Sequence, residues 1–313
     1  MRTDIQIAVP GGTLAAWHYA PSGETFAGSS GLPCVVMAHG FAATRDSGLE
    51  GFAERFAAAG LHVLAFDYRG FGESIGGTPG TVSPAAQVAD YRGAVAFARS
   101  LAGVDPDRIV VWGVSLSGGH VFPVAAADPR IAGAIALTPA VDGPVAMRGA
   151  VGNLGAAATG VSAAVAADLV AAARGGTPVT LPVVAEPGAV GVMTAPGAAA
   201  EYRRIAGPTW TNRVPARSAA AVGAYRPGRR AKDVRCPMLV QIADEDQSAP
   251  PAPARRAAFR ARADVRHYPC DHFDVYPGSE WFEQAVAHQL HFLHRHFAPG
   301  SEFAPVVPVM VNA

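Results

Sequence analysis

The chain has 313 residues, of which half are hydrophobic and 16% are charged. This length and composition suit one large α/β domain with an insertion, or two ordinary domains, and they exclude a disordered chain. Its 25 Lys and Arg residues equal its 25 Asp and Glu residues in number, so the charge balance gives no support to a nucleic acid or an anionic membrane as a partner.

Short apolar runs alternate along the chain with amphipathic segments of helix length. This pattern predicts a mostly parallel, eight-stranded sheet with helices on both faces. Two antiparallel lead-in strands are expected at residues 3–8 and 13–19, joined by a Pro-Gly-Gly turn. The buried strands expected after them lie at residues 34–38, 62–66, 109–112, 131–137, 238–243 and 265–268. The helices expected between them lie at residues 48–59, 84–101, 116–127, 253–263 and 279–296.

Residues 140–230 interrupt this alternation. The segment is dense in Gly, Pro and Ala and contains no clear buried strand. Its Ala-rich stretch at 155–173 is expected to be a helix and not a membrane span, because Ala is nearly neutral in membrane transfer. An insertion between two core strands would lie over the carboxyl edge of the sheet, where ligands of open α/β sheets bind. We therefore expect a core domain at 1–139 and 231–300, a helical cap at 140–230 and a C-terminal tail at 301–313.

A strand, a sharp turn and a helix follow one another at residues 109–119, and Ser115 stands at the turn. A nucleophile elbow needs small residues two before and two after its serine, because the strand and helix backbones nearly touch there. Gly113 meets the first requirement, whereas Ser117 stands where glycine is usual. Ser117 is the alternative nucleophile, but it would lie half a turn further into the helix. We predict Ser115 as the nucleophile and the backbone N–H of Leu116, at the helix start, as one oxyanion donor.

Two late loops supply candidate partners for this serine. Asp244 and Asp246 both follow the strand expected at 238–243. Asp246 has the spacing from the next proline that is usual for a triad carboxylate, so we favour it over Asp244. His272 follows the last expected strand, just before the last helix, and is the predicted base. The order Ser, Asp, His along the chain is the one used by hydrolases of the α/β type.

The second oxyanion donor is expected in the loop after the third strand. His39, Gly40 and Phe41 form this loop, and the backbone N–H of Phe41 is the candidate donor. Gly40 would let the backbone approach the substrate closely. His39 is expected to be a structural hydrogen-bonding residue more than a second base, and it is also a candidate for contact with the substrate.

Several motifs together resemble the α/β-hydrolase superfamily over nearly the whole chain. Residues 39–41 (HGF), 67–72 (DYRGFG) and 272–276 (HFDVY) look like those of dienelactone-hydrolase-like and lysophospholipase-like bacterial proteins, to which fungal polyketide transferases are similar. Residues 210–217 and 225–227 of the insertion fit the same group. The resemblance implies the α/β-hydrolase fold and leaves the substrate undefined.

The large side chains of the insertion are apolar or aromatic, as expected for pocket walls. The residues expected to line an acyl-binding pocket above the serine are Met147, Met193, Tyr202, Trp210 and, beside the base, Val275. Acids in the insertion are few and scattered, so the sequence gives little support to a pocket for a cationic substrate.

These residues predict a serine hydrolase that cleaves a carboxylic ester of a hydrophobic acyl substrate through an acyl-enzyme. The alternatives are a thioesterase or acyltransferase acting on a polyketide-type acyl chain, a serine peptidase, and a binding protein without activity. The predicted mechanism requires neither a metal nor an organic cofactor. The expected partner is a small hydrophobic ester or thioester, and a homodimer is compatible with the sequence.

Cysteine usage and the N-terminal residues bear on the cellular compartment. Cys34, Cys236 and Cys270 cannot all pair, and their spacing matches no zinc site. Residues 1–5 alternate polar and apolar side chains and contain no apolar signal core. We therefore expect a reduced, cytoplasmic protein.

Overall fold

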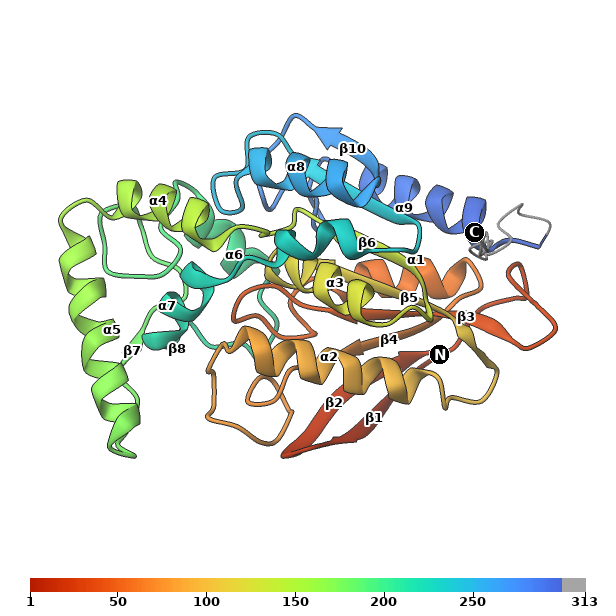
Figure 1. The fold of residues 1–313 in the computed structure, drawn as a ribbon, viewed down its shortest axis with the longest axis horizontal. Coiled ribbons are helices and arrows are strands. Elements are labelled where there is room, and N and C mark those ends of the chain that lie inside the picture. The colour runs from red at the N-terminus through yellow and green to blue at the C-terminus, as the bar shows by residue number, and fades with distance from the viewer. Residues whose placement is uncertain (300–313) are drawn as a thin grey trace, which may run out of the picture.

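The computed structural model describes residues 1–299, so the tail expected at 301–313 lies outside the described residues. Within the described part, eight strands form one sheet in the order β1-β2-β4-β3-β5-β6-β9-β10 (Figure 1). Strand β2 pairs antiparallel with both β1 and β4, and the other neighbours pair in parallel. The predicted mostly parallel, eight-stranded sheet is therefore confirmed.

The strands lie close to the predicted ranges. Those of the large sheet are β1 (Arg2–Val9), β2 (Gly12–Tyr19), β3 (Leu32–Ala38), β4 (His62–Phe66), β5 (Val104–Val114), β6 (Ile131–Leu137), β9 (Met238–Ala243) and β10 (Asp264–Tyr268). Strands β3, β4, β6 and β9 are apolar and almost wholly buried, as expected for parallel strands that are covered on both faces.

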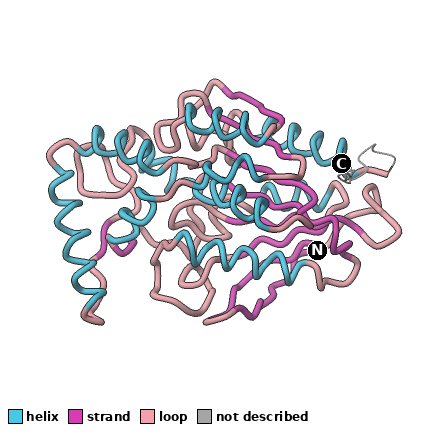
Figure 2. Tube along the Cα trace, in the orientation of Figure 1, coloured by secondary structure: helices cyan, strands magenta, loops and turns pink. Residues whose placement is uncertain are grey.

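Helices cover both faces of this sheet (Figure 2). They are α1 (Glu50–Ala58), α2 (Pro84–Ala98), α3 (Leu116–Ala127), the 3₁₀ helix η1 (Pro227–Asp233), α8 (Pro251–Ala261) and α9 (Phe282–Phe297). Helices α1 and α9 contact each other, and α2, α3, η1 and α8 form a second contiguous layer. Phe52 of α1 lies 5.1 Å from the Trp112 ring of β5 and 4.9 Å from the Phe282 ring of α9. These aromatic contacts pack the layer formed by α1 and α9 against the centre of the sheet.

Residues 140–230, called the inserted segment below, form a group of helices at one end of the sheet (Figure 1). Its elements are α4 (Gly143–Leu154), α5 (Ala157–Ala173), β7 (Thr180–Leu181), α6 (Ala198–Ile205), β8 (Val214–Pro215) and α7 (Arg217–Ala224). The Ala-rich stretch is helix α5, and no helix among the described residues is long and apolar enough to cross a membrane.

The side chain of Asp168 in α5 connects three parts of the inserted segment by hydrogen bonds. Its buried carboxylate accepts hydrogen bonds from the backbone N–H groups of Val179 and Arg217, at 2.9 and 2.8 Å. The Arg217 guanidinium also bonds to it at 2.9 Å. A buried carboxylate is stable only when it is satisfied in this way, so Asp168 links α5 to the chain before β7 and to the start of α7.

Candidate active site

Ser115 lies at the sharp turn between β5 and α3. Its φ angle is +57°, in the left-handed region that is unfavourable for a residue other than glycine. The turn is held by its backbone, because Ser115 N donates to Leu137 O at 2.9 Å and Ser115 O accepts from Ala140 N at 2.9 Å. A strained serine between a strand and a helix is the geometry of a nucleophile elbow.

Close backbone packing surrounds this turn. A Cβ atom at Gly113 would lie 2.2 Å from the carbonyl oxygen of Ser117, and one at Gly40 would lie 3.1 Å from the Ser115 Cβ. Ser117 is fully buried, and its hydroxyl bonds to the carbonyl oxygen of His39 and to the Tyr68 hydroxyl. Ser117 therefore fills the usual glycine position with a satisfied polar group, and it does not line the cavity beside Ser115.

The structure brings Ser115, His272 and Asp246 together from three separate loops. His272 Nε2 lies 3.0 Å from Ser115 Oγ, and His272 Nδ1 lies 2.6 Å from Asp246 Oδ2. Asp246 Oδ1 accepts hydrogen bonds from Ser248 N and Ala249 N, at 2.8 and 2.6 Å. All three members of the set are buried. Their contacts give the nucleophile–base–carboxylate order that acyl transfer requires.

The other candidate carboxylate lies elsewhere. Asp244 is exposed, and its Oδ1 bonds to His267 Nδ1 at 2.8 Å and to Arg255 at 3.2 Å. Among the described residues, no hydrogen bond or ion pair joins it to His272. Of the two candidates, Asp246 is therefore the one whose carboxylate lies against the His272 imidazole.

The electrostatics of His272 suit a general base. Burial lowers the pKa of this imidazole, but the charge of Asp246, its hydrogen bond and the charge of Asp271 outweigh burial and leave the pKa raised. The neighbouring carboxylate therefore favours uptake of a proton at Nε2, the atom that faces Ser115.

The backbone N–H groups of Phe41 and Leu116 are the candidate oxyanion donors. Phe41 and Leu116 both line the cavity beside Ser115, and neither N–H donates a hydrogen bond to another described group. A side-chain hydrogen bond stabilises the loop that carries Phe41, because His39 Nδ1 donates to Gly40 O at 3.0 Å. Burial lowers the pKa of His39 to about 4, so this imidazole is neutral and fixed as a donor. Residues 40–43 are called the oxyanion loop below.

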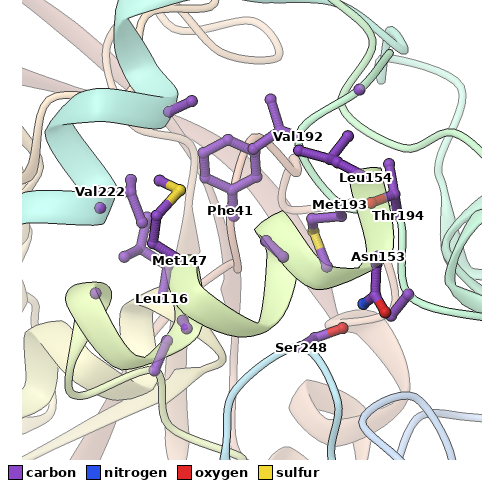
Figure 3. A pocket seen from close by; sticks show the side chains of 18 of the residues that line it. Phe41, Leu116, Met147, Asn153, Leu154, Val192, Met193, Thr194, Val222 and Ser248 are labelled. Atoms are coloured by element: carbon purple, nitrogen blue, oxygen red, sulfur yellow. The ribbon is translucent and has the colours of Figure 1, made fainter. Parts of the chain in front are cut away.

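A cavity of about 120 Å³ opens beside Ser115, between the core and the inserted segment. Figure 3 shows Phe41, Met147 and Met193 around it. Its remaining large apolar side chains are those of Leu116, Leu154, Val161, Val192, Val222 and Tyr225. No Asp or Glu of the described chain lines it. The cavity can therefore bury an apolar group next to the hydroxyl, and it offers no carboxylate to a cationic group.

Four residues expected to contact the substrate lie outside this cavity. His39 and Val275 are fully buried in the core, and Tyr202 is buried with its hydroxyl bonded to the oxyanion loop. Trp210 lines a different hollow of about 450 Å³, whose walls are rich in threonine. The size and apolar character of the Tyr202 and Trp210 side chains favoured a pocket wall. In the structure, the Tyr202 hydroxyl and the Trp210 indole N–H each donate a hydrogen bond to a backbone carbonyl.

The cavity also contains polar residues that the sequence interpretation missed. Gln247 and Ser248 line it directly after the candidate carboxylate, so their place on that loop was an available signal. Asn153 and Thr194 come from the inserted segment, where no periodic pattern identified inward-facing positions. Among residues 1–299, no group of three or more His, Cys, Asp or Glu side chains is arranged to hold a metal ion.

Comparisons with known proteins agree with this architecture. Residues 32–273 match a family model described as serine aminopeptidase, S33. The quorum-quenching protein AidA of Acinetobacter baumannii is 35% identical over 93% of this chain and 94% of its own length. The polyketide transferase af380 of Aspergillus fumigatus is 27% identical over 88% of this chain and 93% of its own.

A solved structure gives the same result for the fold. The α/β hydrolase GrgF from Penicillium sp. sh18 superposes with a TM-score of 0.77 at 24% identity, over 95% of this chain and 99% of that one. The predicted α/β-hydrolase fold is confirmed, and so is the resemblance to the group that includes fungal polyketide transferases.

Proposed function

Because the chain belongs to the α/β-hydrolase family described as serine aminopeptidase, S33, we propose that it is a serine hydrolase with Ser115, His272 and Asp246 as its catalytic triad. One observation carries the proposal: a strained, cavity-facing serine hydroxyl lies 3.0 Å from an imidazole whose other nitrogen lies 2.6 Å from a buried carboxylate. A binding protein would have no need to retain this set of contacts.

The proposed reaction is acyl transfer to Ser115. Its Oγ attacks the substrate carbonyl while His272 Nε2 takes the hydroxyl proton, and the Phe41 and Leu116 N–H groups bind the resulting oxyanion. Asp246 holds the imidazole in the tautomer that leaves Nε2 free to accept the proton. The tetrahedral intermediate then expels its alcohol or thiol, which takes the proton from His272. Water, activated by the same imidazole, attacks the acyl-enzyme and releases the carboxylic acid.

We propose a hydrophobic acyl ester as the substrate, with the inserted segment acting as a cap. The apolar cavity wall formed by helix α4, which carries Met147, supports this choice. The absence of any carboxylate among the described cavity residues disfavours an aminopeptidase, which would need one to hold the substrate's ammonium group. The quorum-quenching activity in the name of the relative AidA is compatible with hydrolysis of an ester or lactone.

The second candidate is a thioesterase or an acyltransferase. The relative named as a polyketide transferase favours it, and the same triad would attack a thioester carbonyl. Matched oxygen and sulfur esters of hexanoic acid distinguish a thioesterase from an esterase, because a thioesterase should turn over the sulfur ester faster. Mass analysis of products formed with an added alcohol separates transfer from hydrolysis.

Turnover of p-nitrophenyl hexanoate by the purified chain tests the proposal. Ser115→Ala and His272→Ala should each reduce kcat below about a tenth of the wild-type value, since triad members act as a unit. Ser117→Ala is the matched control, because it removes a nearby hydroxyl that the proposal gives no chemical role. Equal losses in Ser115→Ala and Ser117→Ala would contradict the assignment of the nucleophile.

A further inference from the structure

Two aromatic side chains of the inserted segment donate hydrogen bonds to the backbone of the oxyanion loop. The Tyr202 hydroxyl donates to Phe41 O at 2.6 Å, and Trp210 Nε1 donates to Ala42 O at 3.1 Å. The two rings lie 5.1 Å apart, so they form one unit. Their polar atoms are directed at the loop and not at the cavity beside Ser115.

The conformation of the oxyanion loop explains why such support matters. Ala42 has a φ angle of +51°, which is unfavourable for any residue that carries a Cβ. The carbonyl before Phe41 is already held, because Gly40 O accepts from His39 Nδ1. With the bonds from Tyr202 and Trp210, three consecutive carbonyl groups each accept a hydrogen bond from a side chain. The strained turn is thus held on both sides of Ala42.

We propose that Tyr202 and Trp210 are positioning residues for the oxyanion hole. The Phe41 N–H belongs to the same planar peptide group as the Gly40 carbonyl, which His39 holds. The bonds from Tyr202 and Trp210 fix the two peptide groups that follow, so they limit rotation about the Phe41 Cα and with it the direction of the Phe41 N–H. The inserted segment would then raise the rate through the backbone of a core loop, in addition to forming the cavity wall. This proposal rests on the proposed function, because the oxyanion forms only when Ser115 attacks a carbonyl.

The variants Tyr202→Phe and Trp210→Phe test the positioning role, since each removes one donor and keeps an aromatic ring. We expect kcat for p-nitrophenyl hexanoate to fall by up to about tenfold in each variant, the loss that one net hydrogen bond would cause, with KM changed by less than about twofold. Binding of a trifluoromethyl ketone, which forms an oxyanion adduct with the serine, should weaken by the same factor as kcat. Active sites are counted by fluorophosphonate titration, so that unfolded protein does not lower kcat.

Tyr91→Phe is the matched control. Its hydroxyl donates to Val36 O and Trp112 O, at 2.9 and 2.6 Å, inside the core. Loss of this buried Tyr-to-carbonyl bonding should lower Tm and leave kcat per active site unchanged. Unchanged kcat and ketone affinity in Tyr202→Phe and Trp210→Phe, with intact labelling by fluorophosphonate, would overturn the positioning role alone. Failure of the wild-type chain to react with fluorophosphonate would overturn the proposed function as well.

A different observation supports a second proposal. A hollow of about 50 Å³ between η1 and α8, called the arginine hollow below, is lined by Arg226, Arg229, Arg256 and Arg260. Its one carboxylate, that of Asp142, lies 4.0 Å from Arg226 Nε. Within residues 1–299, the other three guanidinium groups form no ion pair with any Asp or Glu.

Three of these four exposed charges therefore have no carboxylate partner in the described part of the chain. Arg256 and Arg260 lie one helical turn apart on α8, and like charges at this spacing disfavour a helix. Planar guanidinium groups match the oxygens of a tetrahedral anion, to which they bind by paired hydrogen bonds. We propose that the arginine hollow binds a phosphate group, either as free phosphate or as part of a larger phosphate ester.

Calorimetric titration with inorganic phosphate and with adenosine diphosphate, at an ionic strength held constant with sodium chloride, tests this second proposal. We expect saturable binding that weakens by about tenfold or more in the double variant Arg229→Gln, Arg256→Gln. The control variant Arg148→Gln, Arg174→Gln removes two exposed arginines of the inserted segment and should bind like the wild type. Tighter binding of the nucleotide than of phosphate would identify a phosphate ester as the ligand. No saturable binding, or equal affinity in the two double variants, would overturn the proposal.

Discussion

Replacing Asp246 with asparagine changes the hydrogen bonding of the proposed base in a direction that the structure defines. The backbone N–H groups of Ser248 and Ala249 both donate to Asp246 Oδ1, so the amide oxygen of asparagine would take that position. Its NH₂ group, which only donates, would then face His272 Nδ1. The imidazole would have to carry its proton on Nε2, where it could not accept the proton of Ser115.

The expected loss in kcat is about 10⁴-fold, the size found when the triad carboxylate of a serine protease is replaced by its amide. A second effect concerns pH. In the wild type, turnover should rise with pH through the raised pKa of His272, because the imidazolium cannot accept a proton. The charge of Asp246 is the largest of the three contributions that offset burial at His272, so its removal should lower this pKa and shift the acid limb to lower pH.

The assay measures kcat for p-nitrophenyl hexanoate per folded molecule between about pH 5 and about pH 9. Asp244→Asn is the matched control, since it makes the same chemical change two residues away, on a carboxylate bound to His267 and Arg255 at the surface. It should change kcat by less than about twofold. The reasoning is refuted if Asp246→Asn keeps more than a tenth of the activity, or if Asp244→Asn suffers the larger loss.

Three further predictions concern the cavity, the elbow and the inserted segment. Across unbranched p-nitrophenyl esters from acetyl to octanoyl, kcat/KM should rise by up to about fourfold per added CH₂ over part of the series; a flat profile or a preference for acetyl would argue against an acyl pocket. Gly113→Ala would place a Cβ 2.2 Å from Ser117 O, so kcat should fall by about 10²-fold, and wild-type kcat would show that the strand and helix do not pack this closely. Asp168→Ala should lower the free energy of unfolding in urea by about 3 kcal/mol, because it leaves buried groups unpaired. The exposed control Glu50→Ala should cost under about 1 kcal/mol, and equal costs would contradict the role given to Asp168.

Much of the core could be predicted because its strands carry a local signal. Residues 62–66, 131–137 and 238–243 are largely apolar runs, and the structure has strands at those positions. Strand β5 begins at Val104, five residues before the predicted start at residue 109. Its first part was not predicted because Asp105, Pro106 and Asp107 are residue types typical of turns.

The candidate triad could be anticipated for a related reason. Ser115, Asp246 and His272 each follow a predicted strand, and parallel strands end at the same edge of a sheet. Tyr202 and Trp210 show where this reasoning stops. Their partners are carbonyl groups of residues 41 and 42, far away along the chain, and a backbone acceptor leaves no trace in the sequence. Burial and aromatic character are alike for a pocket wall and for a loop support, so only the three-dimensional contacts distinguish them.

Covalent labelling by a fluorophosphonate, followed by intact-mass analysis and peptide mapping, tests the central assignment most directly. The account predicts one adduct per wild-type chain, located on Ser115. It also predicts an unchanged mass for Ser115→Ala and for His272→Ala within the time that saturates the wild type, because the nucleophile and its base are both required. Labelling of Ser115→Ala at the wild-type rate, an adduct on Ser117, or an unreactive wild-type chain would contradict it.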